Sequence, residues 1–210
     1  MLDFSLHYLQ ILKTKLAGLN LTKILDADEF YNKQILDSIN PYQQSPFFQS
    51  EVQQKKVVVD VGFGGGFPIL PLAKLLPDVQ FVGVESRRKK AEAVTLIAEE
   101  LKLTNVKLVH SRLEDFLFDV PAVVTFKAVG TVKDYLPSIQ ASKNVSVFFY
   151  KGPSFMDLEG ASLKGLTDWK LKQIEPIKVP GTEERHLVSF THQNVPRGTA
   201  KFLVKLSDFL

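Results

Sequence analysis

A run of glycines directly after a strongly apolar segment constrains the fold more than any other feature of the chain. Residues 57–62 begin with three consecutive valines, and such β-branched runs are typical of a strand that is buried on both faces. Gly62, Gly64 and Gly66 then occupy alternate positions and indicate a turn whose backbone a ligand can approach closely. Pro68 suits the first turn of a helix, because its missing N–H would be unpaired there anyway. The stretch therefore predicts a strand, a glycine loop and a helix.

The spacing of these glycines decides which nucleotide-like ligand fits the loop. A dinucleotide-binding G-x-G-x-x-G loop needs its third glycine where this chain has Phe67, which disfavours an NAD-dependent oxidoreductase. From Asp60 onward the chain reads D-x-G-x-G-x-G, which resembles the loop of methyltransferases that use S-adenosylmethionine (SAM). In that interpretation Asp60 and the glycines hold the methionine end of SAM. A tight turn that binds no ligand is the alternative.

The next predicted strand, residues 79–85, ends in a carboxylate at a suggestive distance from the glycines. An acidic residue about 20 positions past such a loop can accept hydrogen bonds from both ribose hydroxyls of a nucleotide cofactor. Glu85 stands at this position. The alternative is that Glu85 caps the helix that follows at Arg87 or is a surface charge.

Apolar segments with strand and helix periods alternate through the middle of the chain. We predict strands at 57–62, 79–85, 106–110, 122–128 and 145–150, and helices at 68–76, 87–101 and 132–141. This alternation is typical of a parallel, doubly wound sheet. Residues 169–179 and 186–191 indicate an antiparallel pair at the sheet edge, and residues 201–210 a short helix or an edge segment. We therefore expect an α/β Rossmann-like fold with about seven mainly parallel strands.

The N-terminal quarter predicts helices that cover the sheet. Leucines recur at three- and four-residue steps over residues 2–19, which predicts an amphipathic helix. A second helix is predicted from 28 to 39, with Phe30, Leu36 and Ile39 facing inward and Pro41 beyond its end. A polar connector is predicted at 43–54. We expect residues 1–54 to form a helical cap that packs on a main domain of residues 55–210.

Composition sets broad limits on function. The 210 residues carry a formal net charge of +3, which neither requires nor excludes a nucleic-acid partner. The chain has no cysteine, and His7, His110 and His192 are isolated, so we predict no disulfide and no metal site. No apolar run approaches the roughly 20 residues that span a membrane. We expect a cytoplasmic monomer.

Several segments together resemble one bacterial family, the rRNA small-subunit methyltransferases RsmG, also called GidB. The similarity covers about residues 20–190. Its segments are Asn20–Thr22, Ile35–Ser38, Asp60–Pro68, Glu85–Lys90, Leu103–Val106, Arg112–Glu114, Lys151–Gly152 and Glu184–Val188. The glycine loop with Phe67–Pro68 and the basic run after Glu85 are the most specific parts.

This resemblance implies methylation of guanine N7 in the 530 loop of 16S rRNA, with the small ribosomal subunit as partner and SAM as cofactor. Guanine N7 already carries a free lone pair, so no general base is required. The site would act by orientation and by holding an unpaired base. Two alternatives remain open. The first alternative is a SAM-dependent enzyme that acts on a small molecule, with the N-terminal helices as a lid. The second is a non-catalytic protein with the methyltransferase fold that binds RNA or a partner.

The resemblance also implies roles for individual residues. The expected cofactor-binding residues are Asp60, Gly62, Gly64, Gly66, Phe67, Glu85, Ser86, Leu113 and Glu114, the last two beside the adenine. Lys127 stands where the family has arginine, and it would face the SAM carboxylate or an RNA phosphate as a positioning group. The expected RNA-binding residues are Arg87, Lys127, Lys151 and Arg185. The alternative for each is a solvated surface charge.

Some positions depart from the family pattern. Phe63, Gly65 and Ile69 replace a serine, an alanine and a glycine of the loop, and Gln34 stands where histidine is common. These departures leave the cofactor expectation intact and bear mainly on the substrate and on activity.

Overall fold

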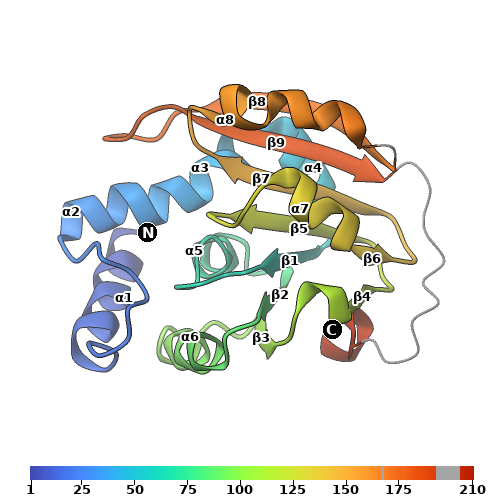
Figure 1. The fold of residues 1–210 in the computed structure, drawn as a ribbon. Coiled ribbons are helices and arrows are strands. Elements are labelled where there is room, and N and C mark those ends of the chain that lie inside the picture. Colours follow the sequence, from blue (N-terminus) through green and yellow to red (C-terminus); the bar gives the residue numbers. More distant parts are fainter. Residues whose placement is uncertain (167, 193–203) are drawn as a thin grey trace.

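A computed structural model describes residues 1–166, 168–192 and 204–210 and shows a seven-stranded sheet in the order β3-β2-β1-β5-β7-β9-β8 (Figure 1). The strands are β1 (Val57–Val61), β2 (Gln80–Glu85), β3 (Val106–His110), β5 (Ala122–Lys127), β7 (Val145–Lys151), β8 (Trp169–Ile177) and β9 (Arg185–His192). The five strands from β3 to β7 are parallel, and β9 is antiparallel to both of its neighbours. The predicted fold class, including the antiparallel edge, is confirmed.

The two faces of the sheet bury separate apolar cores. Along β1, Val58 belongs to one core, whereas Val59 and Val61 belong to the other. The first core is shared with α1 (Leu2–Thr14), α4 (Pro46–Lys55), α5 (Ile69–Leu75) and α6 (Arg88–Glu100). The second is shared with α7 (Val132–Tyr135), α8 (Phe155–Glu159) and a small sheet of β10 (Val204–Lys205), β4 (Phe116–Phe118) and β6 (Gln140–Ala141). Helices on both faces are what a doubly wound sheet requires.

The predicted helix at 132–141 is wrong in its second half. Helix α7 ends at Tyr135, a 3₁₀ turn follows at Leu136–Ser138, and the chain then enters β6. Pro137 lies inside that turn, where it cannot donate the backbone hydrogen bond that a longer helix would need. The small sheet itself was not predicted, because strands of two or three residues carry no readable periodicity.

The first helix is shorter than predicted, and only part of its leucine stripe is buried. Helix α1 ends at Thr14; Leu9, Leu12 and Leu16 are buried, whereas Leu2 and Leu6 are 56% and 47% exposed. Phe4 and Tyr8 are buried as well. Aromatic rings bury more surface than leucines, which favours Phe4 and Tyr8 over Leu2 and Leu6 in the core.

The second helical segment continues past its predicted end. It consists of α2 (Ala27–Phe30), a π-helix (Tyr31–Leu36) and α3 (Asp37–Gln44), with Pro41 inside α3 rather than beyond it. Phe30 and Ile39 are buried as predicted, but Leu36 is only half-buried and Ile35 is buried in its place. A π turn places residues five apart on one face, which explains why Ile35 rather than a residue four positions after Phe30 faces the core.

The predicted polar connector at 43–54 is wrong, because most of it forms α4. The Ser45 side chain caps this helix by accepting a hydrogen bond from the Phe48 N–H at 3.1 Å, and Pro46 follows at the first helical position. Phe48 stacks on Phe148 of β7 with ring centroids 4.4 Å apart. A serine followed by a proline is a sequence signal for the start of a helix, and it indicates α4 here.

At the C-terminus, residues 201–203 of the predicted final segment lie outside the described residues. The described remainder forms β10 and a 3₁₀ turn at Leu206–Phe209. Within the described ranges, no helix combines the length and the apolar character needed to cross a bilayer.

Candidate cofactor and substrate site

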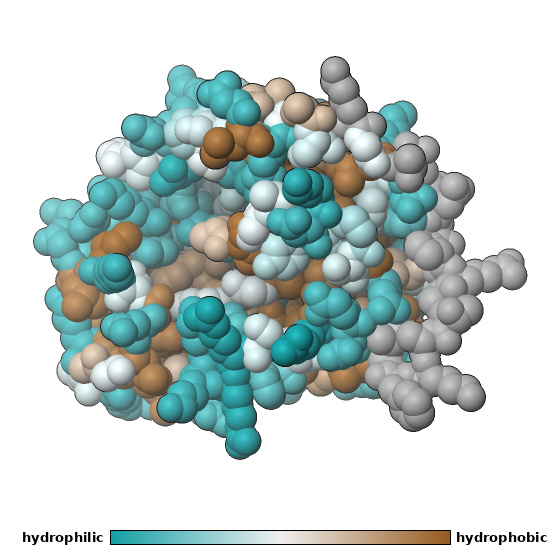
Figure 2. All heavy atoms as spheres, viewed as in Figure 1, coloured by the Kyte–Doolittle hydropathy of each residue, from teal (hydrophilic) through white to brown (hydrophobic). Residues whose placement is uncertain are grey.

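The register of the sheet brings the predicted site residues to one edge. Asp60 of β1 lies opposite Thr125 of β5, and Lys127 of β5 lies opposite Tyr150 of β7. In β9, the residue opposite Lys151 of β7 is His186. The N-terminal helices lie beyond this edge, and the surface between them and the sheet is hollowed and rimmed by polar side chains (Figures 1 and 2). Ligands collect at this edge in doubly wound folds.

The glycine loop adopts backbone conformations that side chains disfavour. Gly62, Gly64 and Gly66 have φ angles of +71°, +55° and +87°. A Cβ atom on Gly64 would have no neighbour closer than 3.8 Å, whereas one on Gly66 would lie 2.4 Å from the Tyr8 hydroxyl oxygen. The loop is therefore open on the side of Gly64 and closed by α1 on the side of Gly66.

The open side of the loop faces a cavity of about 600 Å³, here called the loop cavity. Its walls include Phe67, Ser86, Arg87 and Lys90 besides the glycines. Glu85, only 5% exposed, also lines it. One Glu85 oxygen accepts from the Gly64 N–H at 3.1 Å, and the other accepts from the Arg87 N–H at 2.9 Å. Glu85 thus ties the ends of β1 and β2 together at the cavity wall.

Asp60 is buried beneath the loop, and no described residue forms an ion pair with it. Its Oδ1 accepts from the Thr125 hydroxyl at 2.8 Å, while Oδ2 has no hydrogen-bond partner in the described part of the chain. Burial raises the pKa of Asp60 from 3.8 to about 7, and the Thr125 hydroxyl, the Ile69 amide and the Lys127 charge oppose this shift without cancelling it. The carboxyl therefore changes protonation close to neutral pH.

A second cavity of about 440 Å³, the Leu113 cavity, adjoins the loop cavity and shares Gly62, Ser86, Arg87 and Tyr135 with it. Leu113 is buried in its wall, and Glu114 has an exposed side chain at its rim. Both residues begin the 3₁₀ turn Leu113–Asp115 that follows β3.

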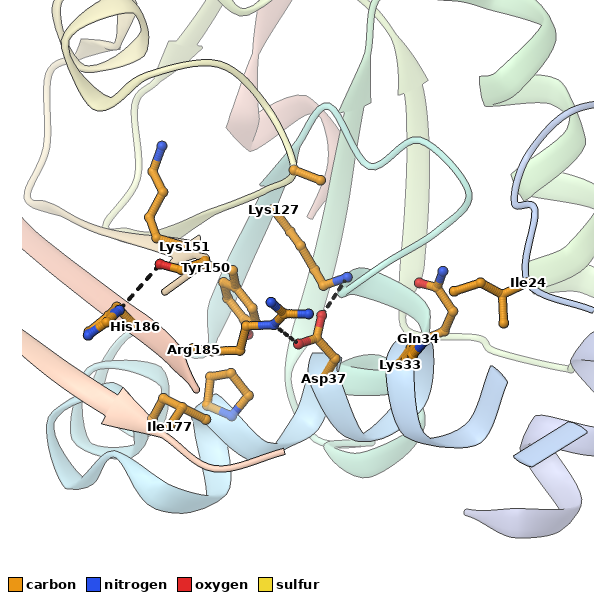
Figure 3. A pocket seen from close by; sticks show the side chains of 13 residues that line it. Ile24, Lys33, Gln34, Asp37, Lys127, Tyr150, Lys151, Ile177, Arg185 and His186 are labelled. Atoms are coloured by element: carbon orange, nitrogen blue, oxygen red, sulfur yellow. Dashed lines mark hydrogen bonds and ion pairs between the residues drawn. The ribbon is translucent and has the colours of Figure 1, made fainter. Parts of the chain in front are cut away.

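A third cavity of about 340 Å³, the Asp37 cavity, opens on the other side of Lys127 (Figure 3). Gln34, Lys127 and Ala128 line both this cavity and the loop cavity. Figure 3 shows Gln34 directed into it from the π-helix, and its amide nitrogen donates to the Thr22 hydroxyl at 3.3 Å. The three cavities therefore adjoin one another along the carboxyl edge, and together they are called the groove.

Asp37 is the centre of a largely buried ion cluster in this cavity. Its carboxylate pairs with the Lys127 ammonium at 2.9 Å and with the Arg185 guanidinium at 3.0 Å (Figure 3). The side chains of Asp37 and Lys127 are 10% and 13% exposed, and that of Arg185 is 32% exposed. The cluster joins α3, β5 and β9, which are distant in the sequence.

Lys151 is also held by partners inside the chain. Its ammonium contacts the Glu159 carboxylate at 2.8 Å and the Gly130 carbonyl oxygen at 2.9 Å. His186, opposite it in β9, has its Nδ1 3.3 Å from the Gly152 carbonyl oxygen. The cation is therefore fixed at the end of β7 rather than free in solvent.

Most of the predicted cofactor residues line two adjoining cavities, but Asp60 and Gly66 line neither. The predicted RNA-binding residues fall into two kinds. Arg87 is exposed, whereas Lys127, Lys151 and Arg185 have carboxylate partners. The sequence did not identify Asp37 and Glu159 as those partners, because ion pairs between distant segments leave no spacing signal. Within the described ranges, no group of three or more His, Asp or Glu residues gathers as a metal site.

The residues fit the SAM expected from the glycine pattern. The open backbone at Gly64 admits a ligand, and the Glu85 carboxylate on the cavity wall suits ribose hydroxyls. Asp60 is buried and does not line the cavity, so it would act on a cationic ammonium through the loop. The loop and Leu113 cavities adjoin and have volumes of about 600 and 440 Å³.

Comparison with known proteins agrees with this geometry. A family profile described as GidB, rRNA small subunit methyltransferase G, matches residues 3–188. The ribosomal RNA small subunit methyltransferase G of Petrotoga mobilis is 32% identical over 85% of this chain and 84% of that protein. The enzyme of the same name from Lactococcus lactis subsp. cremoris is 30% identical over 86% of this chain and 78% of its own length.

Solved structures share the fold at lower identity. Magnesium protoporphyrin IX methyltransferase from Synechocystis, solved with bound SAM, superposes with a TM-score of 0.56 at 11% identity, covering 92% of this chain and 99% of that one. A 16S rRNA (adenine(1408)-N(1))-methyltransferase from Catenulisporales acidiphilia gives 0.52 at 20% identity, covering 73% of this chain and 94% of that one. With the family match over most of its length, the chain belongs to the GidB family, rRNA small subunit methyltransferase G, and is a SAM-dependent methyltransferase.

Proposed function

We propose that this enzyme transfers the methyl group of SAM to N7 of a guanine in the 530 loop of 16S rRNA, in the small ribosomal subunit. The observation that carries the proposal is that Gln34, Lys127 and Ala128 line both the loop cavity and the Asp37 cavity. A cofactor in the first cavity and a base in the second would meet at this junction. The names of the relatives support RNA of the small subunit as substrate.

The chemistry asks little of acid–base groups. When bound, SAM supplies a methyl group activated by its sulfonium. Guanine N7 is unprotonated at neutral pH and has a lone pair, so no residue has to remove a proton. Orientation of the two reactants can then supply most of the catalysis, an effect worth roughly 7–11 kcal/mol in favourable cases. The paired state of Lys127 and Asp37 agrees with such a site, because neither group is free to act as a base or an acid.

The Asp37 cavity can hold the acceptor base in the orientation that the reaction needs. Guanine presents two acceptors, N7 and O6, on one edge. The Gln34 amide and the Lys127 ammonium lie at the junction of the two cavities and can donate to O6, which places N7 toward the cofactor. An unpaired loop nucleotide is the easiest to place in such a pocket.

Contacts with RNA phosphates would position the substrate without identifying the base. Arg87 is exposed at the rim of the loop cavity and is available for such a contact. Arg185 is one-third exposed and uses its Nε for Asp37, so its outer nitrogens remain able to reach a phosphate. In this proposal Lys127 and Lys151 act mainly by holding Asp37 and Glu159, and they approach RNA only at the cavity floor.

The direct test uses SAM with a labelled methyl group. The protein is incubated with small ribosomal subunits that lack the modification, and the RNA is digested to nucleosides. We expect label in 7-methylguanosine. Subunits that already carry the modification are the matched control and should take up no label. Transfer to another nucleoside, or no transfer while SAM still binds, would contradict the proposal and leave the cofactor assignment standing.

A further inference from the structure

The N-terminal helix α1 contacts the glycine loop directly, which a cap over the sheet would not need to do. The Tyr8 hydroxyl donates a hydrogen bond to the carbonyl oxygen of Gly65, a residue 57 positions away. Leu21, in the segment after α1, packs on the same loop, since a Cβ on Gly65 would lie 2.7 Å from its carbonyl oxygen. Leu21 also lines the loop cavity. The N-terminal segment therefore forms the outer wall of the loop.

Tyr8 itself is held rigidly by aromatic neighbours. Its ring is fully buried and lies parallel to that of Phe67, the residue that ends the loop, with centroids 5.1 Å apart. The rings of Phe30 and Phe4 pack against it in T-shaped arrangements, with centroids 5.6 Å and 5.9 Å from that of Tyr8. Burial raises the pKa of Tyr8 well above its ordinary value, so the phenol remains neutral and keeps its proton for the Gly65 carbonyl. The hydroxyl cannot swing away without disturbing this cluster.

The opposite side of the loop is held by Glu85, which accepts from the Gly64 N–H. The peptides from Gly64 to Gly66 are thus fixed between a donor from α1 and an acceptor from β2. In an unrestrained chain, glycines at positive φ would exchange among many conformations. Fixing them in advance reduces the entropy that the cofactor must remove when it binds.

We infer that Tyr8 is a positioning residue for SAM: its hydroxyl bond to Gly65 sets the glycine loop in its binding conformation and couples docking of α1 to cofactor affinity. The inference rests on the cofactor and not on the proposed rRNA target. Because affinity and coupling are reciprocal, SAM should in turn stabilise the docking of α1.

The experiment compares Tyr8→Phe with Tyr42→Phe. Each variant deletes one hydroxyl from a buried ring in the N-terminal helices. The Tyr42 hydroxyl accepts from the Gln53 amide at 3.2 Å, and this residue does not line any of the three cavities. Both variants should lose similar stability in urea unfolding. Only Tyr8→Phe should speed amide exchange of residues 62–67 in the cofactor-free protein, and it should weaken SAM binding about tenfold by calorimetry.

Equal SAM affinity in wild type and Tyr8→Phe, or equal weakening in both variants, would overturn the inference and leave Tyr8 as a packing residue. A second measurement needs no variant. Saturating SAM should slow the exchange of α1 amides in the wild-type chain, beyond the slowing of amides in β8, which lies at the far edge of the sheet. Unchanged exchange in α1 would also overturn it. Neither result depends on whether rRNA accepts a methyl group, so failure of the rRNA proposal is distinguished from failure of this one.

Discussion

The carboxyl ends of β1 and β2 and those of β5 and β7 belong to one sheet, yet they present different chemistry to the groove. On the β1–β2 side the walls include the glycine loop, and the buried carboxyl groups of Asp60 and Glu85 form no ion pair within the described ranges. On the β5–β7 side, Lys127 and Lys151 are each paired with a carboxylate from another element. In our proposal the first side binds the cofactor, whereas on the second side the chain supplies the counter-ions itself.

Asp60 provides the largest test of this difference, because it is buried and one of its oxygens has no hydrogen-bond partner among the residues that the structure describes. Burial raises its folded-state pKa from 3.8 to about 7, so the folded chain keeps a proton that the unfolded chain releases between these pH values. The wild type should therefore lose about 4 kcal/mol of stability as the pH rises from about 4 to 8. Asp60→Asn should lack this component, and urea unfolding at several pH values measures it. If the stability of wild type and of Asp60→Asn changed equally with pH, the charge of Asp60 would already be compensated inside the folded chain.

Asp37 differs from Asp60, because its carboxylate pairs with two cations, Lys127 and Arg185. Asp37→Asn leaves the buried Lys127 ammonium without its counter-ion, and we expect a loss of about 3 kcal/mol in urea unfolding, most of it recovered in the double variant with Lys127→Met. Glu92→Gln is the matched control. It breaks the exposed pair with Arg88 near β2 and should cost under about 1 kcal/mol. Equal losses in the two single variants would remove the contrast between the two sides.

Glycine should be required on one side of the groove and dispensable on the other. Gly66→Ala introduces a Cβ 2.4 Å from the Tyr8 hydroxyl at a φ of +87°, and we expect about 2–3 kcal/mol of destabilisation together with loss of SAM binding. Gly152→Ala, at the end of β7, meets nothing within 4 Å and should stay within about 0.5 kcal/mol of wild type. Thermal unfolding with and without SAM measures both effects. If Gly66→Ala proved as stable as wild type, helix α1 would have to shift and make room for the added Cβ, which would contradict the closed side of the loop.

The smallest of the expected effects concerns Glu85, on the cofactor side of the groove. Glu85→Ala should weaken SAM binding by about 1–2 kcal/mol, because ribose hydroxyls would lose a buried acceptor. Glu114→Ala changes an exposed carboxylate at the rim of the Leu113 cavity and should alter affinity less. Calorimetric titration with SAM distinguishes them. Should Glu114→Ala prove the more damaging, the ribose would have to be placed nearer the Leu113 cavity.

The same contrast explains how much could be predicted from the sequence. The five parallel strands up to β7, the glycine loop and the position of Glu85 follow from local spacing, because a loop and the strand before it are consecutive in the chain. The partners of Lys127 and Lys151 could not be predicted, because Asp37 and Glu159 reach them only through tertiary packing. The contact of Tyr8 with Gly65 was missed for the same reason. Helix α4 could have been predicted from Ser45 and Pro46, and it was not.

The π-helix at Tyr31–Leu36 sets the phase of the helical segment that follows it. A π turn accommodates one more residue than an α turn, so it absorbs that residue without rotating the helix beyond it. If the same residues adopted α geometry, Asp37 and the residues after it would be displaced by about 100° around the helix axis. Gln34 and Asp37 would then no longer share a wall of the Asp37 cavity. The local winding of the N-terminal helices is therefore as much a part of this cavity as the side chains that line it.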